Sequence, residues 1–137
     1  MLNFHFDVDG KDFTLAGNAS GQLKKGLRQL GVDPETVRRA AIAMYEGEIN
    51  MVIHAGGGTA DVTVSEEEIV ITLADHGPGI KDIDAAMQEG FSTAPDDIRS
   101  LGFGAGMGLP NMKRYSDEMT IESTVGVGTT IVMKIKI

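Results

Sequence analysis

The sequence predicts an α+β fold, a two-layer sandwich with helices on one face of a mixed or mostly antiparallel sheet. Three features lead to this prediction: alternating apolar residues at the N-terminus, a long segment of helical periodicity in the first half, and a return of alternation in the second half. The 137 residues, 42% of them hydrophobic, are enough for one core and too few for a second domain. We therefore expect residues 1–137 to form a single domain.

The chain opens with a predicted strand. Residues 2–8 alternate between apolar and polar side chains, and Asp9-Gly10 is typical of a turn into a second short strand at residues 13–15. Asn18 is expected to cap a first helix, which carries leucines at helical spacing and ends at Gly31.

A long central helix is predicted next. Asp33 has the character of an N-cap and Pro34 of a first helical residue, and the helix would continue to Gly56-Gly57-Gly58. Its apolar residues recur at helical spacing at Val37, Ala41, Met44, Met51 and Ala55.

The second half returns to strands. Residues 61–64 and 69–73 alternate and are joined by an acidic turn, which indicates an antiparallel hairpin. Residues 76–104 are rich in Gly, Asp, Ser and Pro and are expected to be mostly irregular, as long functional or mobile loops are.

The C-terminal part is predicted to contain one more helix and two more strands. The helix would run from about Pro110 to Tyr115, with Met112 facing inward. Strands near 119–123 and 129–137 would follow, separated by Gly126-Val-Gly128.

Charge and composition exclude several functions. A net charge of −8 argues against nucleic acid as a partner, because phosphates need clustered Lys or Arg. The absence of cysteine excludes disulfides, iron–sulfur clusters and thiolate zinc sites. No apolar run approaches the roughly 20 residues that cross a bilayer. We expect a cytoplasmic protein without a membrane partner.

The first block that carries chemistry is Glu46-Gly-Glu-Ile-Asn50 in the central helix. Glu46, Asn50 and His54 are spaced by four and so lie on one stripe. A carboxylate one turn from an amide suits deprotonation of a water or hydroxyl beside a Mg²⁺ held by the amide oxygen. The alternative is a polar helix face with internal hydrogen bonds. Glu48 lies roughly opposite Glu46 and is expected to be solvated or paired with an arginine such as Arg38.

The second block, Asp75-His-Gly-Pro-Gly79, follows an apolar strand. Asp75 can accept a hydrogen bond from the exocyclic amine of a purine, and Gly77 and Gly79 allow main chain to approach the ring without a Cβ in the way. The alternative is the ordinary start of an Asp-Gly-rich loop.

The third block alternates glycines immediately before a predicted helix, at Gly104, Gly106 and Gly108, and continues into Leu109-Pro110. Such a segment presents N–H donors and the positive end of a helix dipole, which together form a phosphate site. A flexible linker is the alternative, although linkers seldom lead into a helix with proline at its first position. The P-loop, Rossmann and eukaryotic-type kinase motifs are all absent from the sequence.

The order and spacing of these blocks resemble the GHKL superfamily of gyrase, the ninety-kilodalton heat-shock chaperones, histidine kinases and the MutL mismatch-repair proteins. The resemblance extends from Pro34 to Ile137. It implies the Bergerat ATP-binding fold, ATP and Mg²⁺ as cofactors, and a lid at about residues 80–104. The matching blocks are Glu46 to Asn50 for the N box, Asp75 to Gly79 for the first glycine box, Gly104 to Gly108 for the second, and Gly126-Val-Gly128-Thr129 for the last glycine-threonine element.

Within that superfamily the chain is similar to the stand-alone bacterial anti-sigma factors and switch-protein serine kinases. The similarity rests on Glu46-x-x-x-Asn50-x-x-x-His54, on Gly90-Phe-Ser-Thr93, and on the segment from Asp117 to Ser123. It implies a role for each of several residues: Glu46 as the base for a serine hydroxyl, Asn50 as the Mg²⁺ ligand, Asp75 as the adenine contact, Thr129 reaching the purine through water, and His54 with the lid glycines at the phosphates.

The sequence departs from this branch inside the N box, where Gly47 and Glu48 are unusual, and in the lid segment 94–101. A histidine kinase is not expected. Its phosphoacceptor histidine belongs to a dimerisation helix pair, whereas His5, His54 and His76 fall in a strand, the N box and a loop.

The predicted function is therefore an ATP-binding serine/threonine kinase of the anti-sigma factor type. It would transfer the γ-phosphate of ATP to a small switch protein resembling an anti-sigma antagonist. The alternative is a non-catalytic binder of a sigma factor or other regulator, gated by ATP or ADP. A weaker reading is an uncoupled ATPase, and a homodimer is left open.

Overall fold

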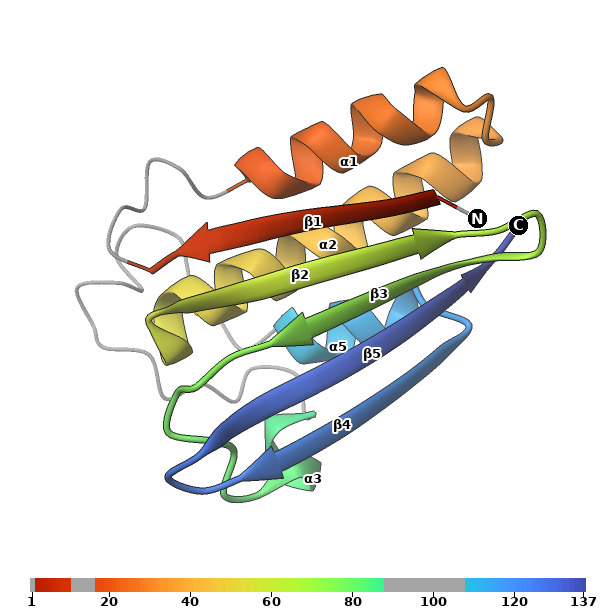
Figure 1. Cartoon of the computed structure of the whole chain (residues 1–137). Helices are drawn as coiled ribbons and strands as arrows, with labels where there is room; N and C mark the ends of the chain where they lie inside the picture. The colour runs from red at the N-terminus through yellow and green to blue at the C-terminus, as the bar shows by residue number, and fades with distance from the viewer. Residues whose placement is uncertain (1, 11–16, 88–107) are drawn as a thin grey trace.

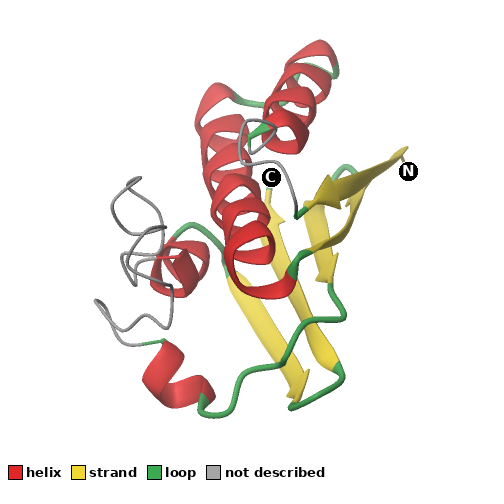
Figure 2. Ribbon diagram, turned by 90° about the vertical axis from the view of Figure 1, so that its left-hand side faces the viewer, coloured by secondary structure: helices red, strands yellow, loops and turns green. Residues whose placement is uncertain are grey.

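The computed structural model describes residues 2–10, 17–87 and 108–137 (Figure 1). Five strands form one antiparallel sheet in the order β1-β2-β3-β5-β4, with the helices on one of its faces (Figure 2). This confirms the predicted two-layer α+β sandwich. The strands are β1 (Leu2–Asp9), β2 (Gly57–Val64), β3 (Glu68–Ala74), β4 (Glu118–Thr124) and β5 (Gly128–Lys136), and the helices are α1 (Asn18–Gln29), α2 (Pro34–Ala55), α3 (Ile83–Ala86) and α5 (Gly108–Arg114).

The strands present alternate residues to the helices, as a period of two requires. A row of paired residues crosses the sheet at Val62, Ile71 and Met133, each at most 1% exposed. Residues from the helices close the core over this row. They are Leu23 and Leu27 of α1, Met44 of α2 and Met112 of α5, all fully buried.

The hairpin predicted from residues 61–64 and 69–73 is confirmed as β2 and β3, and the two strands predicted near the C-terminus are β4 and β5, which pair antiparallel. β2 begins four residues earlier than the predicted strand, because Gly57 already lies opposite Asp9 in the ladder with β1. The strand expected at residues 13–15 lies outside the described residues. In the predicted lid, Asp82 accepts a hydrogen bond from the Ala85 N–H at 3.1 Å and so caps α3, and residues 88–107 lie outside the described part.

The central helix α2 has the predicted ends. Asp33 accepts hydrogen bonds from the N–H groups of Glu35 and Thr36, at 3.1 and 3.4 Å, and Pro34 is the first helical residue. Gly56 ends the helix in the left-handed conformation, with φ of 71°.

The start of α1 differs from the prediction. Asn18 lies inside the helix, and the N-cap is Gly17, whose position carries no side-chain cap. The first N–H groups of α1 are satisfied instead by Glu48 of α2. The N–H of Ala19 donates to Oε2 at 3.1 Å, and that of Ser20 donates to Oε1 at 3.2 Å. A carboxylate 29 residues away thus performs the capping that a local side chain usually performs.

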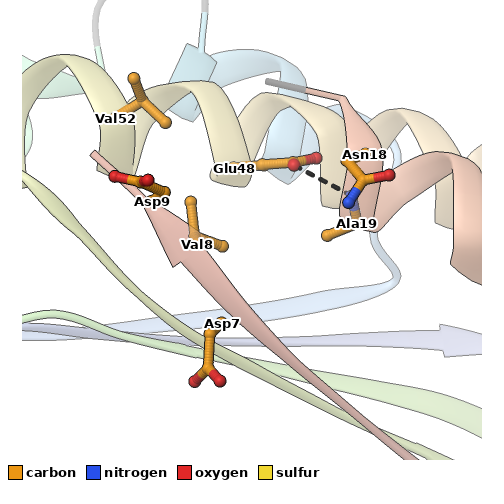
Figure 3. A pocket seen from close by; sticks show the side chains of 7 residues that line it. All are labelled: Asp7, Val8, Asp9, Asn18, Ala19, Glu48 and Val52. Carbon is orange, nitrogen blue, oxygen red and sulfur yellow. Dashed lines mark hydrogen bonds between the residues drawn. The ribbon is translucent and has the colours of Figure 1, made fainter. Parts of the chain in front are cut away.

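The expectation that Glu48 is solvated or paired with Arg38 is therefore wrong. Glu48 is only 2% exposed, and Arg38 pairs with Glu35 at 2.8 Å. A helical wheel places Glu48 away from Glu46, but it does not show that α1 covers that side of α2. Figure 3 shows the Glu48 carboxylate turned to the start of α1, beside a pocket of about 50 Å³. The pocket is lined by Asp7, Val8, Asp9, Asn18, Ala19, Glu48 and Val52.

This arrangement makes a prediction about stability. Glu48→Gln keeps the shape but leaves one carbonyl oxygen for two N–H donors and turns an amide donor toward the second. We expect the free energy of unfolding, measured by urea denaturation, to fall by about 1–3 kcal/mol. The exposed Glu35→Gln should leave it nearly unchanged. Equal values for Glu48→Gln and the wild type would show that the buried cap contributes nothing.

Candidate functional site

The first cluster of predicted site residues lies on α2. Glu46, Asn50 and His54 share one helix face and are each half-buried. Burial raises the pKa of Glu46, and a hydrogen bond from Asn111 partly opposes this rise. Burial lowers the pKa of His54, so its ring is neutral at pH 7.

The start of α5 faces this cluster. A Cβ built on Gly108 would lie 3.8 Å from Oε2 of Glu46 and 4.0 Å from Oδ1 of Asn50. A carboxylate oxygen and an amide oxygen of α2 thus both lie beside this glycine, and each is in ordinary van der Waals contact with the position of its missing side chain. On α5, the Nδ2 of Asn111 donates to Oε1 of Glu46 at 3.3 Å.

The helix α5 differs from the prediction in its first turn. It begins no later than Gly108, so Pro110 is not its first residue. The first four N–H groups of a helix have no partner within it, so a proline is tolerated anywhere in that turn. Leu109 is 7% exposed and belongs to the core. Gly104 and Gly106 lie outside the described residues.

Gly47, unusual in the N box, has a packing role. A Cβ at this position would overlap Cδ1 of Leu73 on β3 and lie 3.4 Å from Cε of Met112 on α5. The missing side chain lets α2 lie close to both elements. That approach brings α5, and with it Gly108 and Asn111, to the side of α2 that carries Glu46.

The second cluster surrounds Asp75, directly after β3. Oδ1 of Asp75 accepts hydrogen bonds from the N–H groups of Gly77 at 2.9 Å and Thr129 at 3.2 Å. The Asp75 N–H donates to the Thr129 carbonyl at 3.0 Å. Within the described parts of the chain, Oδ2 accepts no hydrogen bond. Thr129 is 7% exposed, and its hydroxyl lies 2.8 Å from that of Ser123.

The two glycines of this block are packed against protein. A Cβ on Gly77 would lie 2.7 Å from Cα and Cβ of Ala55, at the end of α2. Gly79 has φ of 80°, and a Cβ there would lie 2.6 Å from the Thr124 carbonyl oxygen. Packing therefore explains both glycines, and their contact with a purine stays a prediction.

The structure thus places the predicted residues in two clusters along α2. Glu46 and Asn50 lie in the middle of the helix, and the Asp75 cluster meets its end at Ala55 through Gly77. Ala55 lies nine positions after Glu46, which is roughly 13 Å along the helix axis. The small pocket beside Glu48 is a different place, between β1, α1 and α2.

Two residues were missed from the sequence. Asn111 lies three positions after Gly108, close to one helical turn, so a helix that begins at Gly108 instead of Pro110 would have placed the two on the same face. Ser123 lies opposite Thr129 in the β4–β5 ladder, which counting outward from the Gly126 turn would have shown.

The donor set fits Mg²⁺ only together with a ligand. No group of three or more His, Asp or Glu side chains could hold a metal ion in the described ranges 2–10, 17–87 and 108–137. The Asn50 oxygen lies 4.0 Å from the Cβ position of Gly108. It is the kind of hard ligand that Mg²⁺ takes along with phosphate oxygens and water.

Among the helices in the described ranges, none has the length and apolar character needed to cross a membrane.

The family model for histidine kinase-, DNA gyrase B- and HSP90-like ATPases matches residues 36–137, and this chain belongs to that family. The anti-sigma F factor of Thermoanaerobacter sp. (strain X514) is 36% identical, over 96% of this chain and 89% of that protein. The serine/threonine-protein kinase RsbT of Bacillus subtilis (strain 168) is 33% identical, over 82% of this chain and 83% of that protein.

A solved structure, the SiaB-SiaC complex from Pseudomonas aeruginosa, contains a chain with a similar fold. The similarity has a TM-score of 0.64 and covers 96% of this chain and 88% of that chain, at 13% sequence identity. At this identity it shows the fold alone. The family match together with this fold confirms the predicted GHKL membership and the Bergerat-type sandwich.

The position of Gly47 leads to a prediction. Gly47→Ala adds a Cβ that must displace Leu73, so we expect overpacking to lower the free energy of unfolding by about 1–3 kcal/mol. Gly21→Ala in α1 is the matched control, because nothing lies within 4 Å of its Cβ. That change should raise stability by up to about 1 kcal/mol, since alanine favours helix. If thermal or urea denaturation shows that both substitutions change the free energy of unfolding in the same direction, α2 does not pack tightly against Leu73 at Gly47.

Proposed function

We propose that this chain is an ATP-dependent serine/threonine-protein kinase of the anti-sigma factor type, which phosphorylates a small regulatory protein. The observation that carries the proposal is the pairing of Glu46 and Asn50 beside Gly108. A carboxylate whose pKa is raised and an amide oxygen both lie within 4.0 Å of the Cβ position of that glycine. The relatives named as an anti-sigma F factor and as a serine/threonine-protein kinase support it.

The nucleotide would lie along α2. The purine amine would donate to Oδ2 of Asp75, while the phosphates would reach the space beside Gly108. The separation of the two clusters along the helix suits an extended nucleotide. Thr129 and Ser123, whose hydroxyl oxygens lie 2.8 Å apart, would hold a water that bridges to the purine.

Bound Mg²⁺ would neutralise charge on the phosphates, with the Asn50 oxygen as its protein ligand. Glu46 would accept the proton of the attacking serine or threonine hydroxyl. The hydroxyl oxygen forms a bond to the γ-phosphorus, the bond from that phosphorus to the β–γ bridging oxygen breaks, and ADP leaves with the electron pair. Water in place of the hydroxyl would give slow ATP hydrolysis.

The environment of Glu46 predicts a pH dependence. A general base must be ionised, so activity is present above the pKa of Glu46 and is lost as pH falls through it. Because burial raises this pKa, the loss should begin closer to neutrality than for an ordinary glutamate.

A second candidate function is supported by the relatives named anti-sigma F factor. In this reading the chain binds a sigma factor or another regulator in one nucleotide state and releases it in the other, without phosphotransfer. The two functions differ in whether a partner protein gains phosphate.

Recognition of adenine can be tested at one oxygen. Asp75→Asn, with its amide oxygen in the Oδ1 position, keeps the acceptor for Gly77 and Thr129 and changes the free oxygen into a donor. ATP affinity, measured by calorimetry with Mg²⁺, should fall about tenfold or more. Wild type should prefer ATP to GTP. Equal binding of the two nucleotides, or unchanged ATP binding by the variant, would refute the Asp75 assignment.

The chemical roles on α2 can be separated by two substitutions. Glu46→Gln keeps the shape and removes the base, so we expect phosphate transfer to fall by about 10² to 10⁴ with ATP affinity nearly intact. Asn50→Ala removes the proposed ligand, so Mg²⁺-dependent ATP binding itself should weaken. Transfer is followed with γ-labelled ATP and candidate small regulatory proteins.

Some residual transfer by Glu46→Gln is expected, because positioning and charge neutralisation supply much of the catalysis. If the Glu46→Gln protein phosphorylates its partner at the wild-type rate, Glu46 is not the general base. A wild-type protein that binds ATP and a regulator but transfers no phosphate would favour the nucleotide-gated binder.

A further inference from the structure

Building on the proposed kinase activity, we propose that Asn111 is a positioning residue for Glu46. It would hold Oε1 of the carboxylate so that Oε2 faces the space beside Gly108, where the acceptor hydroxyl gives up its proton. Neither the family blocks nor the sequence pattern assigns a role to Asn111.

The two carboxylate oxygens of Glu46 have different contacts, which supports a different role for each. Oε1 of Glu46 accepts the Asn111 amide at 3.3 Å, and Oε2 lies 3.8 Å from the Cβ position of Gly108. The amide must present its NH₂ group here, because its own oxygen would be repelled by an acceptor-only carboxylate. One oxygen is therefore engaged, and the other is directed to the site.

The backbone around Asn111 is well anchored. Met112, its neighbour on α5, is fully buried, and its Cε lies 3.4 Å from the Cβ position of Gly47. The Tyr115 N–H donates to the Asn111 carbonyl at 3.0 Å, within the last turn of the helix. The amide is thus presented to Glu46 by a packed helix, which is what orienting a base requires.

The charge state of Glu46 depends on the same contact. Among the described residues, burial raises the pKa of Glu46, the Asn111 hydrogen bond lowers it, and no charged group of a neighbouring element contributes. Loss of the amide would therefore let the carboxylate become protonated at higher pH. In sequence, α5 follows directly after the glycine block, so the residue that holds the base belongs to the segment that borders the predicted phosphate site.

A purely structural contact between α2 and α5 is the competing explanation. It predicts lower stability on removal of the amide, with no change in the ionisation of Glu46. The pKa of Glu46 can be measured in the protein without ligand by ¹³C NMR of the glutamate carboxyl groups, with Glu46→Gln identifying the resonance. This readout is independent of any kinase activity.

We expect Asn111→Ala to raise the measured pKa of Glu46 by about half a pH unit or more. Asn111→Asp, which has the same shape and no donor at neutral pH, should raise it further through like-charge repulsion. Asn111→Gln retains the amide and should stay closer to the wild type. Lys113→Ala, an exposed change on the same helix, is the matched control and should have no effect.

The second readout is phosphate transfer from Mg²⁺·ATP to water across a pH series. For Asn111→Ala the rate at pH 7 should fall about tenfold, with ATP affinity unchanged and the acidic limb of the profile moved to higher pH. A Glu46 pKa that is the same in the wild type, Asn111→Ala and Asn111→Asp would overturn the inference, whether or not stability falls. If the wild-type chain transfers phosphate neither to water nor to any candidate regulatory protein, the proposed function fails, and the NMR result alone decides whether Asn111 holds the carboxylate.

Discussion

Three consecutive residues of α2 point in three directions, and the rest of the structure depends on this. Successive side chains on a helix are about 100° apart. Glu46 opens onto the candidate site, Gly47 lies against β3 and α5, and Glu48 caps the start of α1. Moving or turning α2 would therefore disturb the site, the core and the second helix together. A helix fixed on three sides can hold a catalytic group with little conformational freedom.

The two carboxylates of this segment differ in what their surroundings leave available. Glu48 is fully buried, and both of its oxygens accept backbone N–H groups. Glu46 is half-buried, and among the described residues its carboxylate accepts a hydrogen bond only from the Asn111 amide, on Oε1. A carboxylate with both oxygens engaged and no access to solvent is structural. One with a free oxygen and a raised pKa is suited to proton transfer.

Asp75 combines the two kinds of role in one side chain. Its Oδ1 joins the loop after β3 to the start of β5 through Gly77 and Thr129. Its Oδ2 carries no hydrogen bond from the described residues. The same contacts that orient the carboxylate also fix the glycines around it, and Gly77 in turn rests on the end of α2. The adenine end of the proposed site is thus built on the helix that carries Glu46.

The sequence by itself determined the class of fold, the ends of α2, the β2–β3 hairpin and the two C-terminal strands, because local periodicity, capping and turn chemistry act between near neighbours. The roles it indicated for Glu46, Asn50 and Asp75 stay predictions. It also gave the resemblance that the family match confirms. The tertiary structure decided what lies against each face of a helix. Three contacts join segments that are far apart in the chain: Glu48 caps α1, Gly47 packs against Leu73, and Asn111 donates a hydrogen bond to Glu46. Packing of this kind leaves no local periodic signal, so a helical wheel could place Glu48 opposite Glu46 without showing that α1 would cover it.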